Sequence, residues 1–320
     1  IKYCMDKKID SIILSLTNSQ KILKTQLIQT LWSGYGQLNR VVLDNKSVII
    51  KHIKYPTTQD HPHGWNSDIS HQRKVKSYQI EINWYKGHQE TISNAYFPKY
   101  IASGEIDNEK YLLLEDLKNK GFETKMKITW DQVKFCIKCL AYFHAKNLGV
   151  PPHNLWEIGT YWHLNTRPNE LERLEDKELR KVAPLIDIKL NSANFQTLVH
   201  GDAKLANFMF NNDDVSAVDF QYIGGGIGVK DLAYFLSSHY DENELFQYEE
   251  KCLTYYFKEL NEALIFFNSK IDRTSLEKEW RELYPYAWCD FYRFLKGWSP
   301  GHWKINSYSE QMKEKVLKCF

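Results

Sequence analysis

The chain has 320 residues, of which 43% are hydrophobic and 14% aromatic, enough apolar side chain for one large core or two moderate ones. This composition excludes a disordered or fibrous protein. Lysine and arginine number 42 against 40 aspartates and glutamates, and no long block of one sign occurs. The balance argues against a nucleic-acid partner and for a small polar or amphipathic one.

The start of the chain, IKYCMDKKIDSIILSLTN, has only a short apolar run interrupted by charges. It predicts neither a signal peptide nor a membrane span, so we expect a cytoplasmic protein without membrane insertion. The six cysteines lie far apart, unlike a disulfide scaffold. Cys136 and Cys139 form a CxxC, but their helical spacing with Val133, Ile137 and Leu140 favours core packing over metal or redox chemistry.

The first part of the chain alternates β-rich runs with one helical segment. QLNRVVLD and SVIIKHI, separated by the turn residues 44–46, predict an antiparallel hairpin. Residues 97–117 repeat this pattern, with Gly104 and residues 107–108 at the turn. Between the hairpins, DISHQRKVKSYQIEINWYKG has helical periodicity and ends at Gly87. We therefore expect a small antiparallel sheet with one interposed helix.

The pattern becomes helical after LLLEDL. Thr129 and Gln132 form a capping-box pattern that opens a helix of about 16 residues. Further helices are expected near residues 169–190, 230–238, 242–264, 273–296 and 306–319. We predict two domains, an N-terminal lobe of residues 1–117 and a C-terminal lobe of residues 118–320, the second interrupted by a β-hairpin.

This hairpin carries LVHGDAKLANFMFNNDDVSAVDF, in which Asp202, Asn207 and Asp219 follow at offsets of five and twelve. Phosphoryl transfer by a kinase requires a group that orients the attacking hydroxyl and oxygen ligands that hold divalent metal against the nucleotide phosphates. A loop after TLVH presents Asp202 as the base. Asn207 supplies a neutral oxygen, and Asp219, at the end of the strand VSAVDF, supplies the hard anionic ligand that suits Mg²⁺.

The same residues resemble a known family. HGDAKLAN followed by VDF is similar to the catalytic and metal-binding loops of the aminoglycoside phosphotransferase and choline kinase superfamily, and AVDFQYIGGGIGVKDLAYFLSS resembles its ecdysteroid-kinase-like branch. The resemblance spans roughly residues 32–295 and is strongest over 198–238. It implies a protein-kinase-like bilobal α+β fold, with a small antiparallel sheet in the N-lobe and a mainly helical C-lobe, and ATP and Mg²⁺ as cofactors.

The resemblance also implies a nucleotide site in the first lobe. Ser33, Gly34 and Gly36 lie in SGYGQLNRVVL, where backbone N–H groups would cover phosphates, although an ordinary hairpin-entry loop has the same composition. Lys51 matches the strand lysine that holds the α and β phosphates, and Glu81 its helical ion-pair partner. Taken singly, both residues are also typical of a solvated surface, and it is their order relative to Asp202 that favours the functional reading.

Further positions follow from the resemblance. Backbone groups from Glu115 to Leu117 would read the adenine edge, unless this stretch is a solvent-facing connector. Lys204, two residues after the base, would neutralise charge on the transferred phosphoryl group, or is an exposed loop lysine. Asp231 would hold the catalytic loop, cap its own helix, or do both. His200 is expected to support the loop and not to act as the base.

Two departures from protein kinases favour a small-molecule acceptor. Gly201 stands where many protein kinases carry the arginine that pairs with a phosphorylated activation loop. Only eleven residues separate Asp219 from Asp231, too few for a long peptide-docking segment.

The acceptor site is sought in YPYAWCDFYRFLKGWSPGHW. Aromatic faces beside a carboxylate suit a cation or a flat apolar ring, whereas helical aromatics are more often core. Our candidate acceptor residues are Trp288, Asp290, Tyr292 and Trp298. Elsewhere, HPHGWNSDISH (61–71) is expected to form a surface loop and not a metal site.

The sequence thus predicts an ATP- and Mg²⁺-dependent kinase of a small-molecule hydroxyl, with an amino alcohol, a sterol-like or an aminoglycoside-like acceptor. The alternative is a catalytically silent kinase-fold protein that binds a nucleotide or small molecule, and the intact set of charged residues weighs against it. A metal-dependent hydrolase is a third possibility, but no HExxH-type motif is present.

Overall fold

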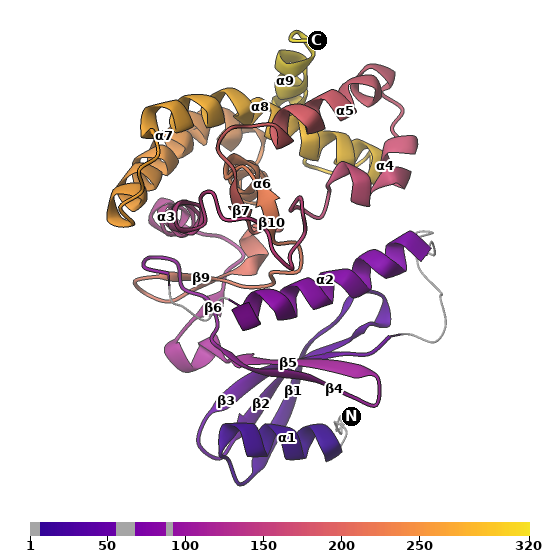
Figure 1. The fold of residues 1–320 in the computed structure, drawn as a ribbon, viewed down its shortest axis with the longest axis vertical. Helices are drawn as coiled ribbons and strands as arrows, with labels where there is room; N and C mark the ends of the chain where they lie inside the picture. The colour runs from indigo at the N-terminus through magenta and orange to yellow at the C-terminus, as the bar shows by residue number, and fades with distance from the viewer. Residues whose placement is uncertain (1–6, 56–67, 88–91) are drawn as a thin grey trace. The chain divides into compact units, whose positions relative to one another are not determined.

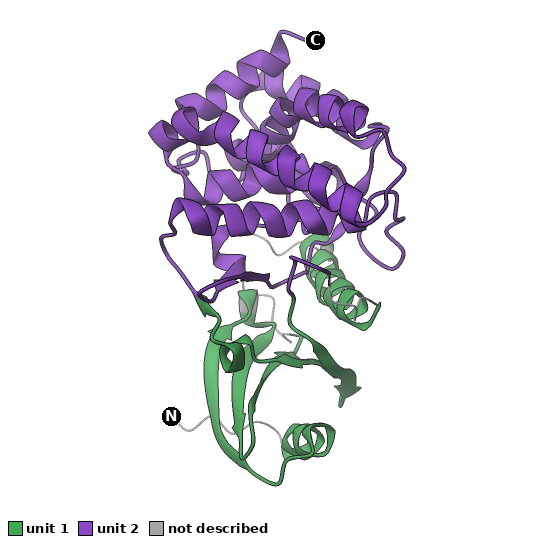
Figure 2. Cartoon of the chain, turned by 90° about the vertical axis from the view of Figure 1, so that its left-hand side faces the viewer, with its two compact units in different colours: residues 1–90, 97–123 green, residues 91–96, 124–320 purple. Residues whose placement is uncertain are grey.

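The computed structural model describes residues 7–55, 68–87 and 92–320, so most of the segment 61–71 lies outside the described residues. The chain forms two compact units, one of residues 1–90 and 97–123 and one of residues 91–96 and 124–320 (Figure 2). We expected a boundary after residue 117. The first unit holds a small antiparallel sheet and the second is mainly helical, which confirms the α+β class.

The sheet of the first unit has five antiparallel strands in the order β1-β2-β3-β5-β4. The strands are β1 (Ile22–Thr30), β2 (Gly36–Leu43), β3 (Ser47–Ile53), β4 (Tyr100–Ile106) and β5 (Glu109–Glu115). Both predicted hairpins are present, and β1 is an additional edge strand. Gly104 lies within β4 and not at the turn as expected. A Cβ at this position would come within 2.7 Å of the Tyr111 hydroxyl oxygen.

Two helices cover opposite faces of this sheet, α1 (Lys7–Thr17) and α2 (Asp68–Gly87) (Figure 1). Ile9 and Ile13 of α1 join a buried cluster that includes Ile50 of β3. Successive side chains of a strand point to opposite faces, so Lys51 points away from α1. The alternation therefore places Lys51 on the face that α2 covers. Helix α2 was predicted from its periodicity, whereas α1 was not expected.

The second unit is built from seven α-helices within the described part of the chain. They are α3 (Trp130–Lys146), α4 (Pro168–Glu172), α5 (Lys177–Asn191), α6 (Val229–His239), α7 (Glu242–Phe266), α8 (Arg273–Trp298) and α9 (Ser307–Leu317). The capping box of Thr129 and Gln132 is present. The single helix expected near 169–190 is two helices, because Asp176 leaves helical geometry and its side chain caps α5.

Short strands carry the loops of the second unit. β7 (Thr197–Val199) pairs with β10 (Gly224–Gly226), and β8 (Phe208–Phe210) pairs with β9 (Val215–Ala217), both antiparallel. The two-residue strand β6 (Glu123–Thr124) marks the boundary of the units. Cys136 and Cys139 are buried in α3 without a disulfide, which confirms the core-packing prediction. None of the helices described is long and apolar enough to span a membrane.

Candidate active site

A buried carboxylate, that of Asp231, fixes the loop that follows β7 through hydrogen bonds. Asp231, in the first turn of α6, accepts hydrogen bonds from the backbone N–H groups of His200 (2.6 Å) and Gly201 (2.9 Å). Its Oδ2 also lies 3.1 Å from Nε2 of His144 in α3. Burial favours the protonated acid, but His144, His200 and the Gly201 N–H outweigh burial and lower the pKa of Asp231. Asp231 thus anchors the loop, as expected.

His200 braces the same loop with both ring nitrogens. Its Nε2 lies 3.0 Å from the carbonyl oxygen of Val218, and its Nδ1 accepts a hydrogen bond from the backbone N–H of Asp202 at 3.2 Å. A carbonyl only accepts and a backbone N–H only donates, so this network assigns the proton to Nε2. His200 therefore supports the loop and has no nitrogen left to act as a base.

Asp202 is buried, and its two carboxylate oxygens have different surroundings. Oδ2 is held by Nζ of Lys204 at 2.8 Å and Nδ2 of Asn207 at 3.0 Å. Oδ1 is buried and has no hydrogen-bond partner among the described residues. A buried unpaired oxygen is costly, and such atoms call for a reason. One oxygen is thus fixed in place while the other remains available to a bound molecule.

The orientation of the Asn207 amide is set by Asp202. Nδ2 of Asn207 donates both to Oδ2 and to the backbone oxygen of Asp202, at 3.0 and 2.8 Å. Both partners are acceptors, so the amide nitrogen must face them. The amide oxygen of Asn207 consequently points away from Asp202, and no hydrogen bond to it occurs in the described structure. A neutral oxygen ligand is therefore free beside the carboxylate.

Asp219 follows β9, which ends at Ala217 and not at Asp219 as expected. The backbone of Asp219 has φ 69°, in the left-handed region that few residues other than glycine adopt. Its Oδ1 accepts a hydrogen bond from Nε2 of Gln221 at 2.5 Å. The N–H of Val218 donates to the backbone oxygen of Asn207 at 2.9 Å and ties the two segments together.

Electrostatics link Lys204 to both carboxylates. Burial disfavours the ammonium, but the Asp202 and Asp219 carboxylates outweigh burial and raise the pKa of Lys204. The side chain is partly buried and ion-paired, so the alternative of a free surface lysine is wrong. Among the described residues, no three His, Cys, Asp or Glu side chains gather as a self-contained metal site. Asn207 and Asp219 nevertheless offer the oxygen atoms that a hard cation prefers, so these residues fit Mg²⁺.

Gly201 is required by the tight packing of this loop. Its φ is +79°, and a Cβ at this position would lie 2.1 Å from the backbone oxygen of Tyr222 and 2.7 Å from the backbone nitrogen of Thr160. Both neighbours are backbone atoms and cannot move aside independently. Only glycine therefore fits between His200 and Asp202.

In the first unit, Lys51 and Glu81 form the expected ion pair. Nζ of Lys51 lies 2.6 Å from Oε2 of Glu81, and both side chains are buried. Ser33 and Gly34 belong to a short 3₁₀ turn, Trp32–Gly34, which connects β1 to β2. Gly36 has φ +116°, and a Cβ there would lie 2.0 Å from the His52 backbone oxygen. The glycine turn lies between β1 and β2, and β2 pairs with β3, the strand that contains Lys51.

Glu115, Asp116 and Leu117 leave the last sheet strand. Asp116 is buried and accepts hydrogen bonds from Nε of Arg40 and Oγ of Ser47, both at 2.6 Å, so the solvent-facing alternative is wrong for this residue. The carbonyl of Leu117 already accepts from the N–H of Phe122 at 3.2 Å. Glu115 forms an ion pair with Lys120 at 2.8 Å. The buried Asp116 holds this segment against the sheet.

The aromatic candidates of α8 are mostly core residues. Trp288 is buried and donates to Oγ of Ser309 at 3.2 Å, and the hydroxyl of buried Tyr292 bonds to Glu310. Asp290 is fully buried and pairs with Arg293 at 2.8 Å. The core alternative therefore holds for Trp288, Asp290 and Tyr292. Trp298 is half-buried and stacks on Phe294 with ring centroids 5.8 Å apart.

Three residues near Asp202 were missed. The rings of Tyr161 and Tyr234 pack edge to face, with their centroids 5.5 Å apart. Burial raises the pKa of the Tyr234 hydroxyl, and Tyr161 and Asp202 raise it further. Lys304, in the segment between α8 and α9, also experiences the charge of Asp202. No local pattern pointed to these residues, because the contacts join positions that are far apart in the chain.

Comparison with known proteins places this fold. Choline kinase from Cryptosporidium parvum superposes with a TM-score of 0.56 at 12% identity, covering 98% of this chain and 97% of that one. Amicoumacin kinase in complex with AMP-PNP, Ca²⁺ and Ami gives 0.51 at 13% identity, with 98% and 95% covered. Spectinomycin phosphotransferase in complex with ADP and spectinomycin gives 0.50 at 14% identity, with 96% and 93% covered. Comparison with curated protein sequences gives no match.

These structures define the class: the chain has the protein-kinase-like fold of small-molecule kinases. The model of the ecdysteroid kinase-like family matches residues 44–150 and 157–269, which is more than half of the chain. The chain therefore belongs to the ecdysteroid kinase-like family. The resemblance seen in the sequence is confirmed.

Proposed function

We propose that the chain is a phosphotransferase that uses ATP and Mg²⁺ to phosphorylate a hydroxyl group of a small molecule. One observation carries the proposal: Asp202 is buried with Oδ2 fixed by Lys204 and Asn207, while Oδ1 has no partner. Asp290, another buried carboxylate of the same unit, uses both of its oxygens. An oxygen left unpaired at a fixed position suits a base that receives a proton from a bound hydroxyl.

In the proposed reaction, Oδ1 of Asp202 orients the acceptor hydroxyl and accepts its proton. The hydroxyl oxygen forms a bond to the γ-phosphorus, and the bond from that phosphorus to the oxygen bridging to the β-phosphate breaks, releasing ADP. Lys204 forms an ion pair with Asp202 and would offer positive charge to the transferred phosphoryl oxygens. The fixed geometry contributes by holding the hydroxyl in line for attack.

Asn207 and Asp219 would hold Mg²⁺, which neutralises phosphate charge when bound. The amide oxygen of Asn207 and the carboxylate of Asp219 would supply the protein ligands. In the first unit, Lys51 would hold the α and β phosphates, fixed by Glu81, and Ser33, Gly34 and Gly36 would cover them. Backbone groups between Glu115 and Leu117 would contact adenine. Choline, amicoumacin and spectinomycin in the names of the structural relatives support an alcohol-bearing small molecule as acceptor.

Nucleotide binding and ADP release test the proposal. The melting temperature of the full chain is measured with ATP, with and without Mg²⁺, and ADP release is then followed over a panel of amino alcohols, sterols and aminoglycosides. We expect stabilisation by ATP that depends on Mg²⁺ and ADP release with at least one alcohol. Asp219→Ala should lose the Mg²⁺ dependence, whereas Asp213→Ala, on the exposed β8–β9 turn, should retain it. Binding without any ADP release would favour a silent nucleotide-binding protein.

A further inference from the structure

Lys304 places an ammonium group among aromatic rings in the second unit. Its Nζ lies 4.8 Å from the ring centroid of Tyr234, 5.3 Å from that of Phe291 and 5.6 Å from that of Trp303. Nζ of Lys304 also donates a hydrogen bond to Oγ of Ser237 at 3.4 Å. Aromatic faces at these distances attract a cation. In this protein they are already occupied by a cation of the chain itself.

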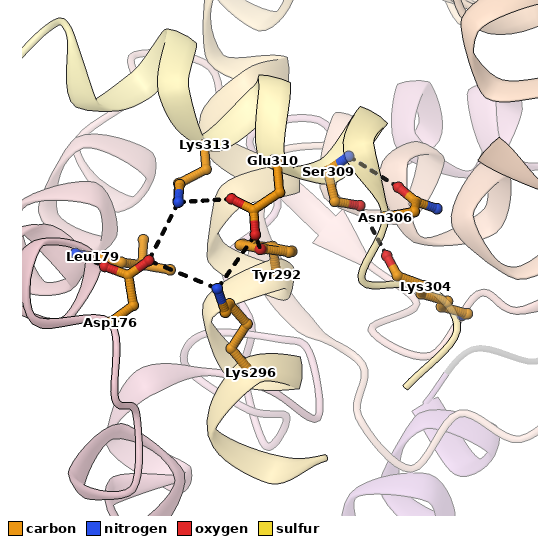
Figure 3. A network of polar contacts seen from close by, with 9 residues as sticks. All are labelled: Asp176, Leu179, Tyr292, Lys296, Lys304, Asn306, Ser309, Glu310 and Lys313. Carbon is orange, nitrogen blue, oxygen red and sulfur yellow. Dashed lines mark hydrogen bonds and ion pairs between the residues drawn. The ribbon is translucent and has the colours of Figure 1, made fainter. Parts of the chain in front are cut away.

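Lys304 differs from its neighbouring lysines in having no counter-ion. Within the described residues, no carboxylate lies within 4.0 Å of its Nζ, whereas Lys296 and Lys313 both contact Asp176 and Glu310 (Figure 3). A partly buried ammonium without a counter-ion is unfavourable. Burial lowers the pKa of Lys304 to about 7, even though Asp202 acts to raise it. The site therefore has positive charge that no carboxylate neutralises directly.

The charges that act on Lys304 show that its ammonium lies near Asp202, the proposed base. Asp202 and Lys204 are the two charged groups that act on the Lys304 ammonium. Asp202 also raises the pKa of the Tyr234 hydroxyl, and the Lys304 ammonium lies over the ring of this tyrosine. The unpaired Oδ1 of Asp202, the Tyr234 hydroxyl and the Lys304 ammonium thus belong to one neighbourhood, formed by the loop after β7, α6 and the α8–α9 segment.

Backbone contacts hold the Lys304 segment against α9. The backbone oxygen of Lys304 accepts a hydrogen bond from Oγ of Ser309 at 2.9 Å, and Oδ1 of Asn306 accepts from the Ser309 N–H at 3.0 Å (Figure 3). Helix α9 is in turn tied to the start of α5 by Lys313, which lies 3.3 Å from Asp176. Lys304 is therefore presented from an anchored segment, as a residue that positions a ligand must be.

We propose that Lys304 selects the acceptor by its charge. The site then accepts an alcohol without a cationic group and rejects alcohols with an ammonium group near the reacting hydroxyl. This inference rests on the proposed function. An incoming cation would meet the like charge of Lys304 and find the aromatic faces occupied. An uncharged alcohol can pack its apolar body on the rings and present an oxygen atom to the Lys304 donor.

A matched pair of alcohols tests this role. Choline and 3,3-dimethylbutan-1-ol have the same shape and differ by a quaternary nitrogen in place of a carbon. Their affinities are measured by ligand-observed NMR on the full chain with Mg²⁺ and AMP-PNP. We expect the wild-type protein to prefer the neutral alcohol by about tenfold or more, because like charges in a partly buried site repel each other strongly.

Variants assign the preference to Lys304. Lys304→Glu should reduce the preference by about tenfold or reverse it, and Lys304→Gln should give an intermediate value. Lys318→Glu makes the same charge change at an exposed residue of the C-terminal segment and should keep the wild-type ratio. Melting temperatures of all variants report folding, and Lys304→Gln retains the test if Lys304→Glu is unstable.

The outcomes separate this inference from the proposed function. An unchanged ratio in both Lys304 variants, or no binding of either alcohol to the wild-type protein, would overturn the role of Lys304. Charge discrimination in binding without ADP release from any alcohol would leave Lys304 as a specificity residue and contradict phosphoryl transfer instead.

Discussion

Two aspartates of the second unit, Asp202 and Asp290, are both buried next to a lysine, yet their carboxylate oxygens differ in how many partners they have. Both oxygens of Asp290 have partners: Oδ1 contacts Arg293 at 2.8 Å, and Oδ2 accepts from Trp162 at 3.0 Å and lies 3.7 Å from Lys230. Asp202 keeps one oxygen unpaired. The comparison teaches that burial and a cationic neighbour do not by themselves distinguish these two carboxylates, whereas the unpaired oxygen of Asp202 does.

The sharpest test of this contrast is Asp202→Asn. The amide keeps the size of the carboxylate but cannot accept the proton of the acceptor hydroxyl, so phosphoryl transfer should slow by about 10²- to 10⁴-fold. Melting temperature and ATP–Mg²⁺ affinity should change little. Single-turnover ADP release, measured beside both binding and melting, checks the prediction. Wild-type turnover in this variant would exclude Asp202 as the base.

The same substitution at Asp290 should act on stability instead. Asp290→Asn removes the carboxylate that lies 2.8 Å from buried Arg293 and leaves the arginine charge without this partner, which costs about 3 kcal/mol of the free energy of unfolding. Urea denaturation measures this loss. At temperatures where the variant is folded, turnover per folded molecule should remain near wild type. A selective loss of turnover with unchanged stability would return Asp290 to the list of acceptor residues.

Lys304 should make the charge preference depend on pH. Its pKa of about 7 lies below the ordinary 10.5, so the ammonium is present below pH 7 and is lost as the pH rises through 7. Of the groups that face it, Lys204 has a pKa that Asp202 and Asp219 raise against the effect of burial, and Tyr234 has a pKa that burial raises. Burial and Lys304 itself lower the pKa of His302. The preference for 3,3-dimethylbutan-1-ol over choline should therefore fall several-fold between pH 6.5 and 8.5. Lys304→Gln should show a flat profile over this range.

The smallest expected effect belongs to Glu310, which ties α9 to α8. Burial raises its pKa, but Lys313, Tyr292 and Lys296 outweigh burial and lower the pKa to about 2 from the ordinary 4.5. The ionised form therefore contributes stability above pH 4.5, which is lost as the pH falls towards 2. Because the side chain is partly exposed, Glu310→Gln should cost less than about 1 kcal/mol at pH 7. The difference in melting temperature from wild type should shrink at pH 4, and a difference that grows there would contradict this assignment.

Sequence alone predicted the elements that local chemistry determines. Thr129 and Gln132 mark their helix because both capping bonds lie within one turn, and Asp202 and Asn207 are recognisable because five residues bring them together. Strand β1 was missed because most of its side chains are exposed, which leaves little apolar alternation. Asp176 divided a predicted helix because its side chain competes for the helix N–H groups.

The candidate site was predictable in its polar half only. Its motif residues share one loop, whereas the aromatic half assembles from Tyr161, Tyr234 and Phe291, each on a different segment. Such contacts depend on how α6 and α8 pack, which no local spacing encodes. The same limit explains why Trp288 and Tyr292 were taken as acceptor candidates, while Lys304, the residue directly after that stretch, was not.

The space around Gly201 has a consequence for regulation and its evolution. A side chain at this position would collide with the backbone of Tyr222 and Thr160, so an arginine that responds to a phosphorylated loop cannot be acquired here by one substitution. An arginine at this position would also require the backbone at Tyr222 and Thr160 to move. A switch that works through a side chain at position 201 therefore requires a change in the backbone of this loop as well.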